Sequence, residues 1–291
     1  GCLGGVISVS GTTQSYSTVS DVPVHSTGAV FFTSIGYHRV YKLQGATAAI
    51  VAGTSAGYAD GPGTQAKFSS PRSLDVDATG NLFVADSSNH RIRKVDGKGV
   101  VTTLAGSTGG FAEGAGGKLN QPYGIALDSK GSVWVADTYN YRIRRLGSGG
   151  SIATVAGSAS GGFADGQGAT ARFNRPMGID FDAVDNLFIA DSYNYRIRKM
   201  TPGGLVTTVA GSGVNGFIDG PVSSARFNRP WDVQVAGGGA VLVADAYNYR
   251  VRRITATGLV NTLAGQASAG LTNGPGVLAR FNRPTGLAVH K

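Results

Sequence analysis

An eleven-residue stretch recurs four times along this chain, and the interval between its copies constrains the fold more than any other feature. One copy reads VADTYNYRIRR and begins at Val135. The aspartates of the four copies are Asp86, Asp137, Asp191 and Asp245. Successive copies are therefore 51, 54 and 54 residues apart, and two further motifs, T-(L/V)-A-G and A-R-F-N-R-P, recur in the same register. Self-similarity at such a period is typical of propellers and solenoids.

Each period contains four strand-like segments. In the repeat that contains Asp137 they are YGIALD (123–128), VWVAD (133–137), YRIRRL (141–146) and SIATVAG (151–157). Apolar and polar residues alternate in them, and Gly, Asp and Ser separate them, which favours strands joined by turns. Four antiparallel strands in each repeat of this length predict the blade of an all-β propeller. A solenoid is the alternative, but its units are usually shorter.

The ends of the chain bear on the number of blades. A degenerate copy, AVFFTSIGYHRVYKL, spans Ala29–Leu43, so five middle-strand pairs are present. GVISVSG at Gly5–Gly11 reads like a fourth strand, and PTGLAVH at Pro284–His290 reads like a first strand. We therefore expect one domain over residues 1–291, with six blades and an incomplete closing blade shared by 5–11 and 284–290. A five-bladed ring is the alternative.

The repeat resembles that of the NHL family, most closely at Ser88–Ile92, which reads S-N-H-R-I. The resemblance covers nearly the whole chain and implies a propeller that is usually six-bladed. It also implies a binding or scaffolding module. Some members bind single-stranded RNA, and related propellers include an amidating lyase and lactonases. Three copies depart from the family pattern by carrying tyrosine in place of the histidine, and tyrosine again where a small residue is common.

The loop between the second and third strands of a blade lies on the same face as the crossover to the next blade, so the Y-N-Y loops and F-N-R-P crossovers should share one face. Aromatic rings interleaved with guanidinium groups suit stacking on bases, sugars or a partner protein. The alternative is that the rings fill gaps between blades. The residues expected to contact a ligand are Tyr139, Tyr193, Tyr247, Tyr141, Tyr195, Tyr249, Arg175, Arg229, Arg283 and Trp231.

The repeated aspartate and the arginine that begins the next strand predict a structural ion pair, such as Asp137 with Arg142. The same pairing is expected in the other copies, as Asp86 with Arg91, Asp191 with Arg196 and Asp245 with Arg250. The G-(F/Y)-x-D-G crossovers contain Asp60, Asp165 and Asp219. We interpret these aspartates as turn residues rather than calcium ligands, because their spacing lacks the alternating oxygen ligands of a calcium loop.

No catalytic residue, metal site or cofactor is predicted. Two alternatives remain open. A hydrolase or lyase site in the central channel could use Asp75, Asp180 and Gln234, which lie in the middle of innermost strands. His25 and His290 fall at equivalent repeat positions and could hold a metal with nearby carboxylates.

Composition limits the partners without identifying them. The formal net charge is +9, which makes RNA an alternative to the protein or glycan partner that we favour. No apolar run reaches the roughly 18 residues needed to span a membrane. Cys2 is the only cysteine, so no disulfide framework exists. The Gly-Cys start resembles the flank of a bacterial lipoprotein cleavage site, which is compatible with a secreted or cell-surface protein.

Overall fold

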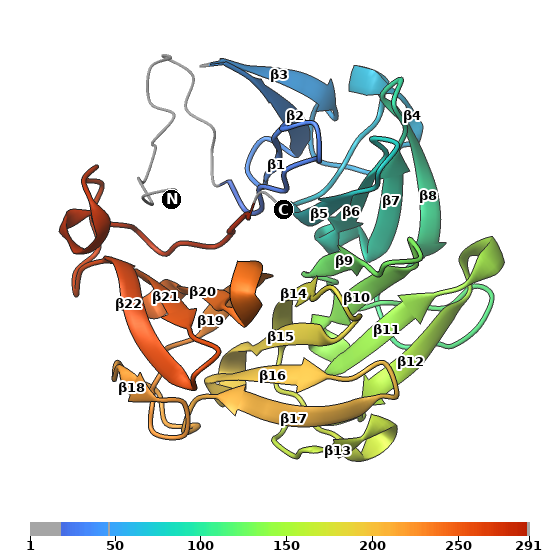
Figure 1. Cartoon of the computed structure of the whole chain (residues 1–291). Helices are drawn as coiled ribbons and strands as arrows, with labels where there is room; N and C mark the ends of the chain where they lie inside the picture. The colour runs from blue at the N-terminus through green and yellow to red at the C-terminus, as the bar shows by residue number, and fades with distance from the viewer. Residues whose placement is uncertain (1–18, 46, 290–291) are drawn as a thin grey trace.

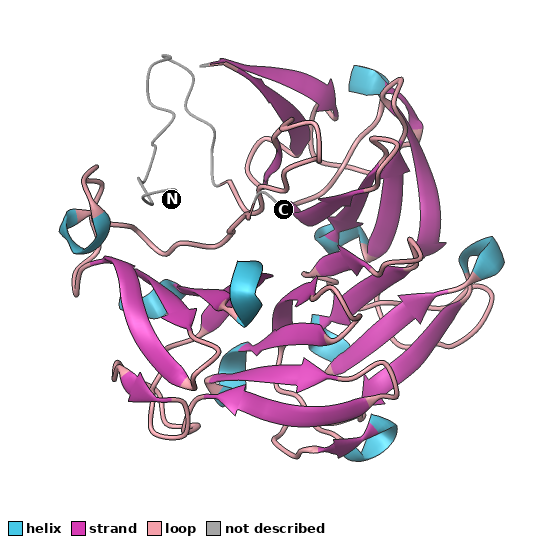
Figure 2. Ribbon diagram, in the orientation of Figure 1, coloured by secondary structure: helices cyan, strands magenta, loops and turns pink. Residues whose placement is uncertain are grey.

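The computed structural model describes residues 19–45 and 47–289, and its extended elements are β-strands grouped in five antiparallel sheets. The sheets are arranged as blades around a common centre, with the chain running from the blue first blade to the orange fifth (Figure 1). Among these residues the only helices are single 3₁₀ turns in the connections (Figure 2). No helix in the described part of the chain is long and apolar enough to cross a membrane. The fold is an all-β propeller, as predicted.

The blades follow the chain in order. The first blade contains β1 (Phe31–Ser34), β2 (Arg39–Gln44) and β3 (Thr47–Ala52). The second contains β4 (Gly61–Pro62), β5 (Pro71–Val76), β6 (Leu82–Asp86), β7 (Arg91–Val95) and β8 (Val100–Gly106). The third contains β9 (Ile125–Leu127), β10 (Val133–Asp137), β11 (Arg142–Leu146) and β12 (Ile152–Gly157).

The fourth and fifth blades repeat this plan. The fourth contains β13 (Gly166–Gln167), β14 (Pro176–Phe181), β15 (Leu187–Asp191), β16 (Arg196–Met200) and β17 (Leu205–Ala210). The fifth contains β18 (Gly220–Pro221), β19 (Pro230–Val235), β20 (Val241–Asp245), β21 (Arg250–Ile254) and β22 (Leu259–Gly265). The 3₁₀ turns are η1 (Gly63–Gln65), η2 (Ser87–Asn89), η3 (Thr138–Asn140), η4 (Ser148–Gly150), η5 (Gly168–Thr170), η6 (Ser192–Asn194), η7 (Gly237–Gly239), η8 (Ala246–Asn248) and η9 (Gly276–Leu278).

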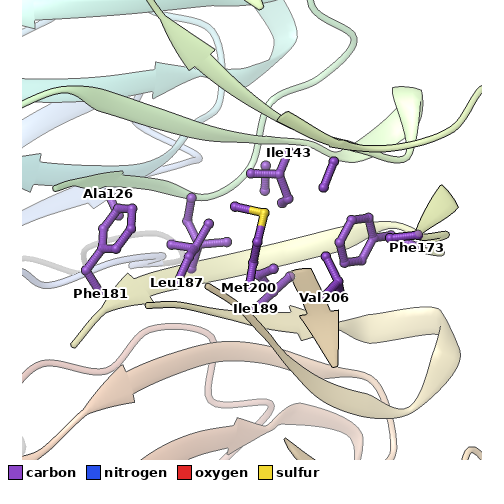
Figure 3. Close-up of a cluster of buried hydrophobic side chains, with 12 residues drawn as sticks. Ala126, Ile143, Phe173, Phe181, Leu187, Ile189, Met200 and Val206 are labelled. Atoms are coloured by element: carbon purple, nitrogen blue, oxygen red, sulfur yellow. The ribbon is translucent and has the colours of Figure 1, made fainter. Parts of the chain in front are cut away.

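The hydrophobic core lies in the seams between neighbouring blades. In one seam, Ala126 and Ile143 of the third blade face Leu187, Ile189 and other apolar side chains of the fourth (Figure 3). Phe173, from the crossover, is fully buried at the end of this seam. Successive strand residues point to opposite faces of a blade, so both faces of a blade carry apolar side chains. In a ring of blades, each of these faces is buried against a neighbouring blade.

The ring closes where the two ends of the described chain meet. Leu287 N donates a 2.8 Å hydrogen bond to Asp232 Oδ2, just as Val235 N donates to Asp180 Oδ2 at 2.7 Å. On its other side, Gly286 lies against the backbone of Ser20 and Asp21. The segment 284–289 therefore lies between the innermost strand of the fifth blade and residues 19–24 of the first.

The described residues thus form five blades rather than the six we expected, because only one inner segment occupies the position between the fifth and first blades. That segment is the one predicted for an inner strand, 284–290, although residues 284–289 are not assigned as a strand. Gly5–Gly11, the expected outer strand, lies outside the described residues, so the shared closing blade remains a prediction.

Candidate ligand-binding face

The loop between the second and third strands of a blade is built by a 3₁₀ turn that follows the repeated aspartate. In the third blade, Asn140 Nδ2 donates to Asp137 Oδ2 at 2.8 Å and to Gly110 O at 2.7 Å. Tyr139 N donates to Asn120 O in the preceding crossover at 3.2 Å. These bonds recur in the fourth and fifth blades. The first tyrosine of each Y-N-Y loop is therefore held beside a crossover, as the shared-face argument predicts.

Three of these tyrosines alternate with three crossover arginines in a continuous stack. Arg175 Cζ lies 4.9 Å from the ring centroid of Tyr139 and 4.4 Å from that of Tyr193. Arg229 Cζ lies 4.7 Å from the centroids of both Tyr193 and Tyr247. Arg283 Cζ continues the series at 4.7 Å from Tyr247. We call Tyr139, Arg175, Tyr193, Arg229, Tyr247 and Arg283 the Tyr/Arg girdle.

The girdle is neither buried between blades nor freely projecting. Its three tyrosines and Arg175 and Arg229 are half-buried, and Arg283 is exposed. The arginines have left-handed backbone angles, with φ of 51° at Arg175, 50° at Arg229 and 53° at Arg283. Such a conformation is uncommon for arginine, and it persists only where surrounding contacts determine it. Ser70 and Gln121 have the same conformation at the equivalent positions, so the crossover fixes the backbone from which each guanidinium reaches a tyrosine.

Two aromatic residues of the innermost strands adjoin the girdle. Trp231 packs its edge against Tyr247, with centroids 6.3 Å apart and planes at 82°. Tyr123 carries Arg72 Cζ 4.1 Å from its centroid, and the charges of Tyr139 and Arg175 are close enough to act on its pKa. Burial nevertheless dominates at Tyr123 and raises its pKa. Trp231 thus belongs to this face as expected, and Arg72 and Tyr123 extend it.

The second tyrosines of the loops occupy a different position. Tyr141, Tyr195 and Tyr249 end their 3₁₀ turns with φ of 56–57°, where the repeat carries histidine at His38 and His90. The ring of Tyr141 lies against Gly161 in the crossover. His90 Nδ1 accepts a hydrogen bond from Gln121 N at 3.1 Å in the corresponding place. The Tyr141 position therefore contacts the crossover, and ligand contact by this second set remains a prediction.

The predicted ion pair is correct for the aspartate but wrong for the arginine. Asp137 Oδ2 binds Arg144 Nη1 at 2.8 Å, whereas Arg142 donates to Asn140 O and lies 4.0 Å from the Phe111 centroid. The other observed pairs are Asp86–Arg93, Asp191–Arg198 and Asp245–Arg252, each at 2.7 Å. These replace the predicted pairs with Arg91, Arg196 and Arg250. Alternate strand residues share a face, so the second arginine reaches the aspartate from the diagonal position.

The buried arginine also binds the aspartate of the G-(F/Y)-x-D-G crossover, and that aspartate binds the threonine of the T-(L/V)-A-G motif. Arg198 Nη2 binds Asp165 Oδ1 at 2.6 Å, and Asp165 accepts hydrogen bonds from the backbone and hydroxyl of Thr208. Asp60, Glu113 and Asp219 bind their own arginines in the same way. The crossover aspartates are thus ion-pair partners besides ending a turn. No cluster of His, Cys, Asp and Glu suited to a metal occurs among residues 19–45 and 47–289.

Carboxylates of the innermost strands tie neighbouring blades together around the central channel. Asp75 Oδ2 accepts a hydrogen bond from Leu127 N at 2.8 Å, and Asp180 Oδ2 accepts one from Val235 N. These aspartates and Gln234 line a cavity of about 210 Å³ on the axis, as expected. His25 bonds to Thr27 Oγ1 at 2.8 Å in an exposed turn, and His290 lies outside the described residues.

Two further acids at the channel mouth went unnoticed in the sequence. Burial raises the pKa of Asp21 to about 7, although hydrogen bonds from Ser73 Oγ and Leu74 N oppose this shift. Burial and the charges of Asp21 and Asp180 hold the pKa of Asp232 well above its usual range. Asp21 and Asp232 stand where other innermost strands carry Gly124, Gly178 and Gly286. Aligning the innermost strands would have revealed these acids.

Comparison with known proteins agrees with this architecture. The sequence model described as "NHL repeat" matches residues 68–95, 119–146 and 227–254. The chain is 26% identical over 324 residues to NHL repeat-containing protein 2 of Homo sapiens, covering 78% of this chain and 44% of that protein. The chain spans less than half the length of the first curated relatives it matches.

Solved structures show the same fold at low identity. A structural genomics protein of unknown function from Bacteroides thetaiotaomicron superposes with a TM-score of 0.72 at 17% identity, covering 96% of this chain and 66% of that one. Virginiamycin B lyase from Staphylococcus aureus superposes with a TM-score of 0.53 at 14% identity, covering 86% of this chain and 85% of that one. Identities this low establish likeness of fold alone.

Proposed function

We propose that this chain, which is an NHL-repeat β-propeller, is a non-enzymatic recognition module that binds its partner on the face carrying the Tyr/Arg girdle. One observation carries the proposal. Three guanidinium groups and three tyrosine rings, contributed by consecutive repeats, are gathered in one stack on one face. None of the three girdle arginines has a carboxylate partner among the described residues, so their charge is available to a ligand.

The scaffold beneath the girdle supports a recognition role because it is preorganised. Asp191 fixes the loop of Tyr193 by accepting hydrogen bonds from Asn194 Nδ2 and from Asn174 N, at 2.8 Å each. Arg198 then holds Asp191 from within the blade. A surface whose side chains are already ordered loses less conformational entropy when it binds. The same construction in three blades gives a rigid, extended contact surface rather than a single reactive centre.

A hydrolase or lyase in the central channel is the second candidate function. It is favoured by the raised pKa values of Asp21 and Asp232 at the channel mouth, since perturbed carboxyls often mark reactive sites. It is opposed by the hydrogen bonds of Asp75 and Asp180, which bind the backbone of the next blade and so have a structural role. The recognition role accounts for the girdle, which a channel enzyme would leave unexplained.

The test changes all three girdle tyrosines to serine and measures binding by biolayer interferometry. Polygalacturonate, poly-glutamate and an oligouridine serve as probes of the glycan, protein and RNA classes. A double variant at exposed tyrosines outside the girdle, Tyr37→Ser with Tyr58→Ser, is the control. We expect the wild type and the control to bind the same probe and the girdle variant to lose it.

The outcome that contradicts the proposal is equally specific. If the girdle variant is folded by circular dichroism and binds each probe as the wild type does, the girdle is not the recognition surface. Catalytic turnover of a lactone or of a peptidyl-hydroxyglycine substrate, abolished by Asp232→Asn, would favour the channel enzyme instead.

A further inference from the structure

The girdle carries positive charge that the protein itself leaves uncompensated. Each of the four buried arginines binds two carboxylates, for example Arg252 with Asp219 and Asp245; the others are Arg93, Arg144 and Arg198. Arg175, Arg229 and Arg283 contact tyrosine rings instead and form no ion pair among the described residues. Burial acts to lower the pKa of Arg229, but a hydrogen bond to Tyr247 and the nearby phenols outweigh it, and the pKa is raised. Arginine side chains are not deprotonated in proteins, so the three guanidinium groups carry positive charge.

Guanidinium groups already lie over the rings of the girdle tyrosines. Tyr193 has two guanidinium groups over its ring, from Arg175 and Arg229, and Tyr247 has Arg229 and Arg283 at 4.7 Å from its centroid, whereas Tyr139 has Arg175 at 4.9 Å. A base or a sugar ring that stacks on Tyr193 or Tyr247 therefore has to compete with two guanidinium groups for the ring. Recognition of single strands depends on such stacking platforms. What the girdle offers is a row of guanidinium and phenol groups, which donate hydrogen bonds to anions.

The exposed large apolar side chains that a protein partner would bury lie outside the girdle. Protein interfaces have a desolvated core rich in aromatic and apolar side chains, where arginine is also enriched, whereas the other charged groups concentrate at the rim. The large apolar side chains most exposed here, among them Phe111, Phe163 and Leu271, do not belong to the girdle. The girdle itself is charged and half-exposed along its length. This distribution favours a polar, multiply charged ligand.

We infer that the girdle binds a polyanionic glycan, a sugar polymer that carries carboxylate or sulfate groups at regular intervals. This inference rests on the proposed recognition function and names its ligand class. Neighbouring guanidiniums share one tyrosine and lie 4.4–4.7 Å from its centroid, so they are spaced less than about 10 Å apart along the stack. A linear polymer with an anionic group on every unit or every second unit can place one group on each guanidinium. The left-handed backbone of each arginine is the same in the three crossovers, so the three guanidinium groups extend from equivalent positions.

The experiment measures the binding of oligogalacturonate, a heparin oligosaccharide and the uncharged methyl ester of oligogalacturonate to the whole chain by isothermal titration calorimetry. The two charged probes distinguish carboxylate from sulfate as the preferred group. We expect at least one charged glycan to bind, its affinity to fall with added salt, and the methyl ester to bind at least about tenfold more weakly.

Matched substitutions locate the site. Arg229→Gln should weaken the binding of the charged glycan about threefold to tenfold, in keeping with the loss of one half-buried charge pair. Arg253→Gln removes the same charge from an exposed position on β21, outside the girdle, and should leave the affinity within about twofold. Arg229→Lys should recover only part of the affinity, because lysine lacks the planar fork of donors.

Each contrary result has a defined meaning. If neither charged glycan binds at low salt, or if Arg229→Gln and Arg253→Gln weaken binding equally, the inference is overturned. If poly-glutamate or oligouridine binds in a girdle-dependent way while the glycans do not, the ligand class is wrong and the recognition function stands. If no probe binds in a girdle-dependent way, both are rejected.

Discussion

Replacing Asp191 with alanine should destabilise the propeller more than removing any carboxylate that reaches solvent. Asp191 is fully buried, and its carboxylate accepts hydrogen bonds from Arg198 Nη1 at 2.7 Å, Asn194 Nδ2 at 2.8 Å and Asn174 N at 2.8 Å. The side chain of Arg198 is also fully buried. The substitution would therefore leave a buried guanidinium with half of its charge compensation and would leave two further donors without an acceptor.

The free energy of unfolding that Asp191→Ala removes depends on the interactions that Arg198 retains in the variant. Breaking a buried ion pair by removing one partner costs about 3–5 kcal/mol. Arg198 retains Asp165 at 2.6 Å and the carbonyl oxygens of Ala164 and Arg172, so we expect the lower end, about 3 kcal/mol. For a domain of this size such a loss lowers Tm by about 6–12 °C. The carboxylate of Asp165 is 44% exposed, so Asp165→Ala should cost only about 1 kcal/mol.

The assay is thermal unfolding followed by circular dichroism and by calorimetry, with Asp191→Ala, Asp165→Ala and the wild type in the same buffer at neutral pH. The reasoning predicts an order, with Asp191→Ala well below Asp165→Ala and the latter close to the wild type. Equal Tm values for the two variants, or a larger loss for Asp165→Ala, would refute the claim that the buried pair carries the stability of the loop.

Three further predictions concern the channel, the inner strands and the girdle. The pKa of Asp21 is raised to about 7, and that of Asp232 lies well above its usual range, so the folded protein holds protons that the unfolded chain releases above about pH 4. Tm should therefore fall as the pH rises from about 5 to about 8. Asp232→Asn should make this fall of Tm with pH smaller. A Cβ added at Gly178 would lie 2.2 Å from Asp232 Oδ1, so Gly178→Ala should cost about 1–3 kcal/mol in chemical denaturation, whereas Gly203→Ala, with no atom nearer than 3.9 Å, should be close to neutral. Changing the three girdle tyrosines to serine should lower Tm by only a few degrees, since the rings are half-buried and the loops are held by the Asp–Asn bonds; a cooperative unfolding transition lost altogether would make them packing residues.

The repeat period was sufficient to predict the architecture. Alternating strands that recur every 50-odd residues must bury both faces of each four-stranded unit, and a ring of blades does so. The grouping of the Y-N-Y loops with the F-N-R-P crossovers followed from the up-and-down order of the strands. The sequence also indicates which of the two arginines of the repeat pairs with the aspartate. In the degenerate first copy, Ser34 replaces the aspartate, Arg39 is kept and Tyr41 replaces the second arginine, so the aspartate and the second arginine disappear together.

Only the tertiary structure determines which side chains of the girdle contact one another and where residues 284–289 lie in the ring. Tyr193 and the two arginines that lie over its ring come from loops of successive repeats, and their contact depends on the rotation between blades, which no local pattern encodes. The position of 284–289 between the fifth and first blades depends likewise on contacts across the whole ring, such as Leu287 with Asp232. Sequence periodicity specifies what each blade buries, because that is set by alternation within a strand. What neighbouring blades present together is set by their relative placement, and that is a property of the closed ring.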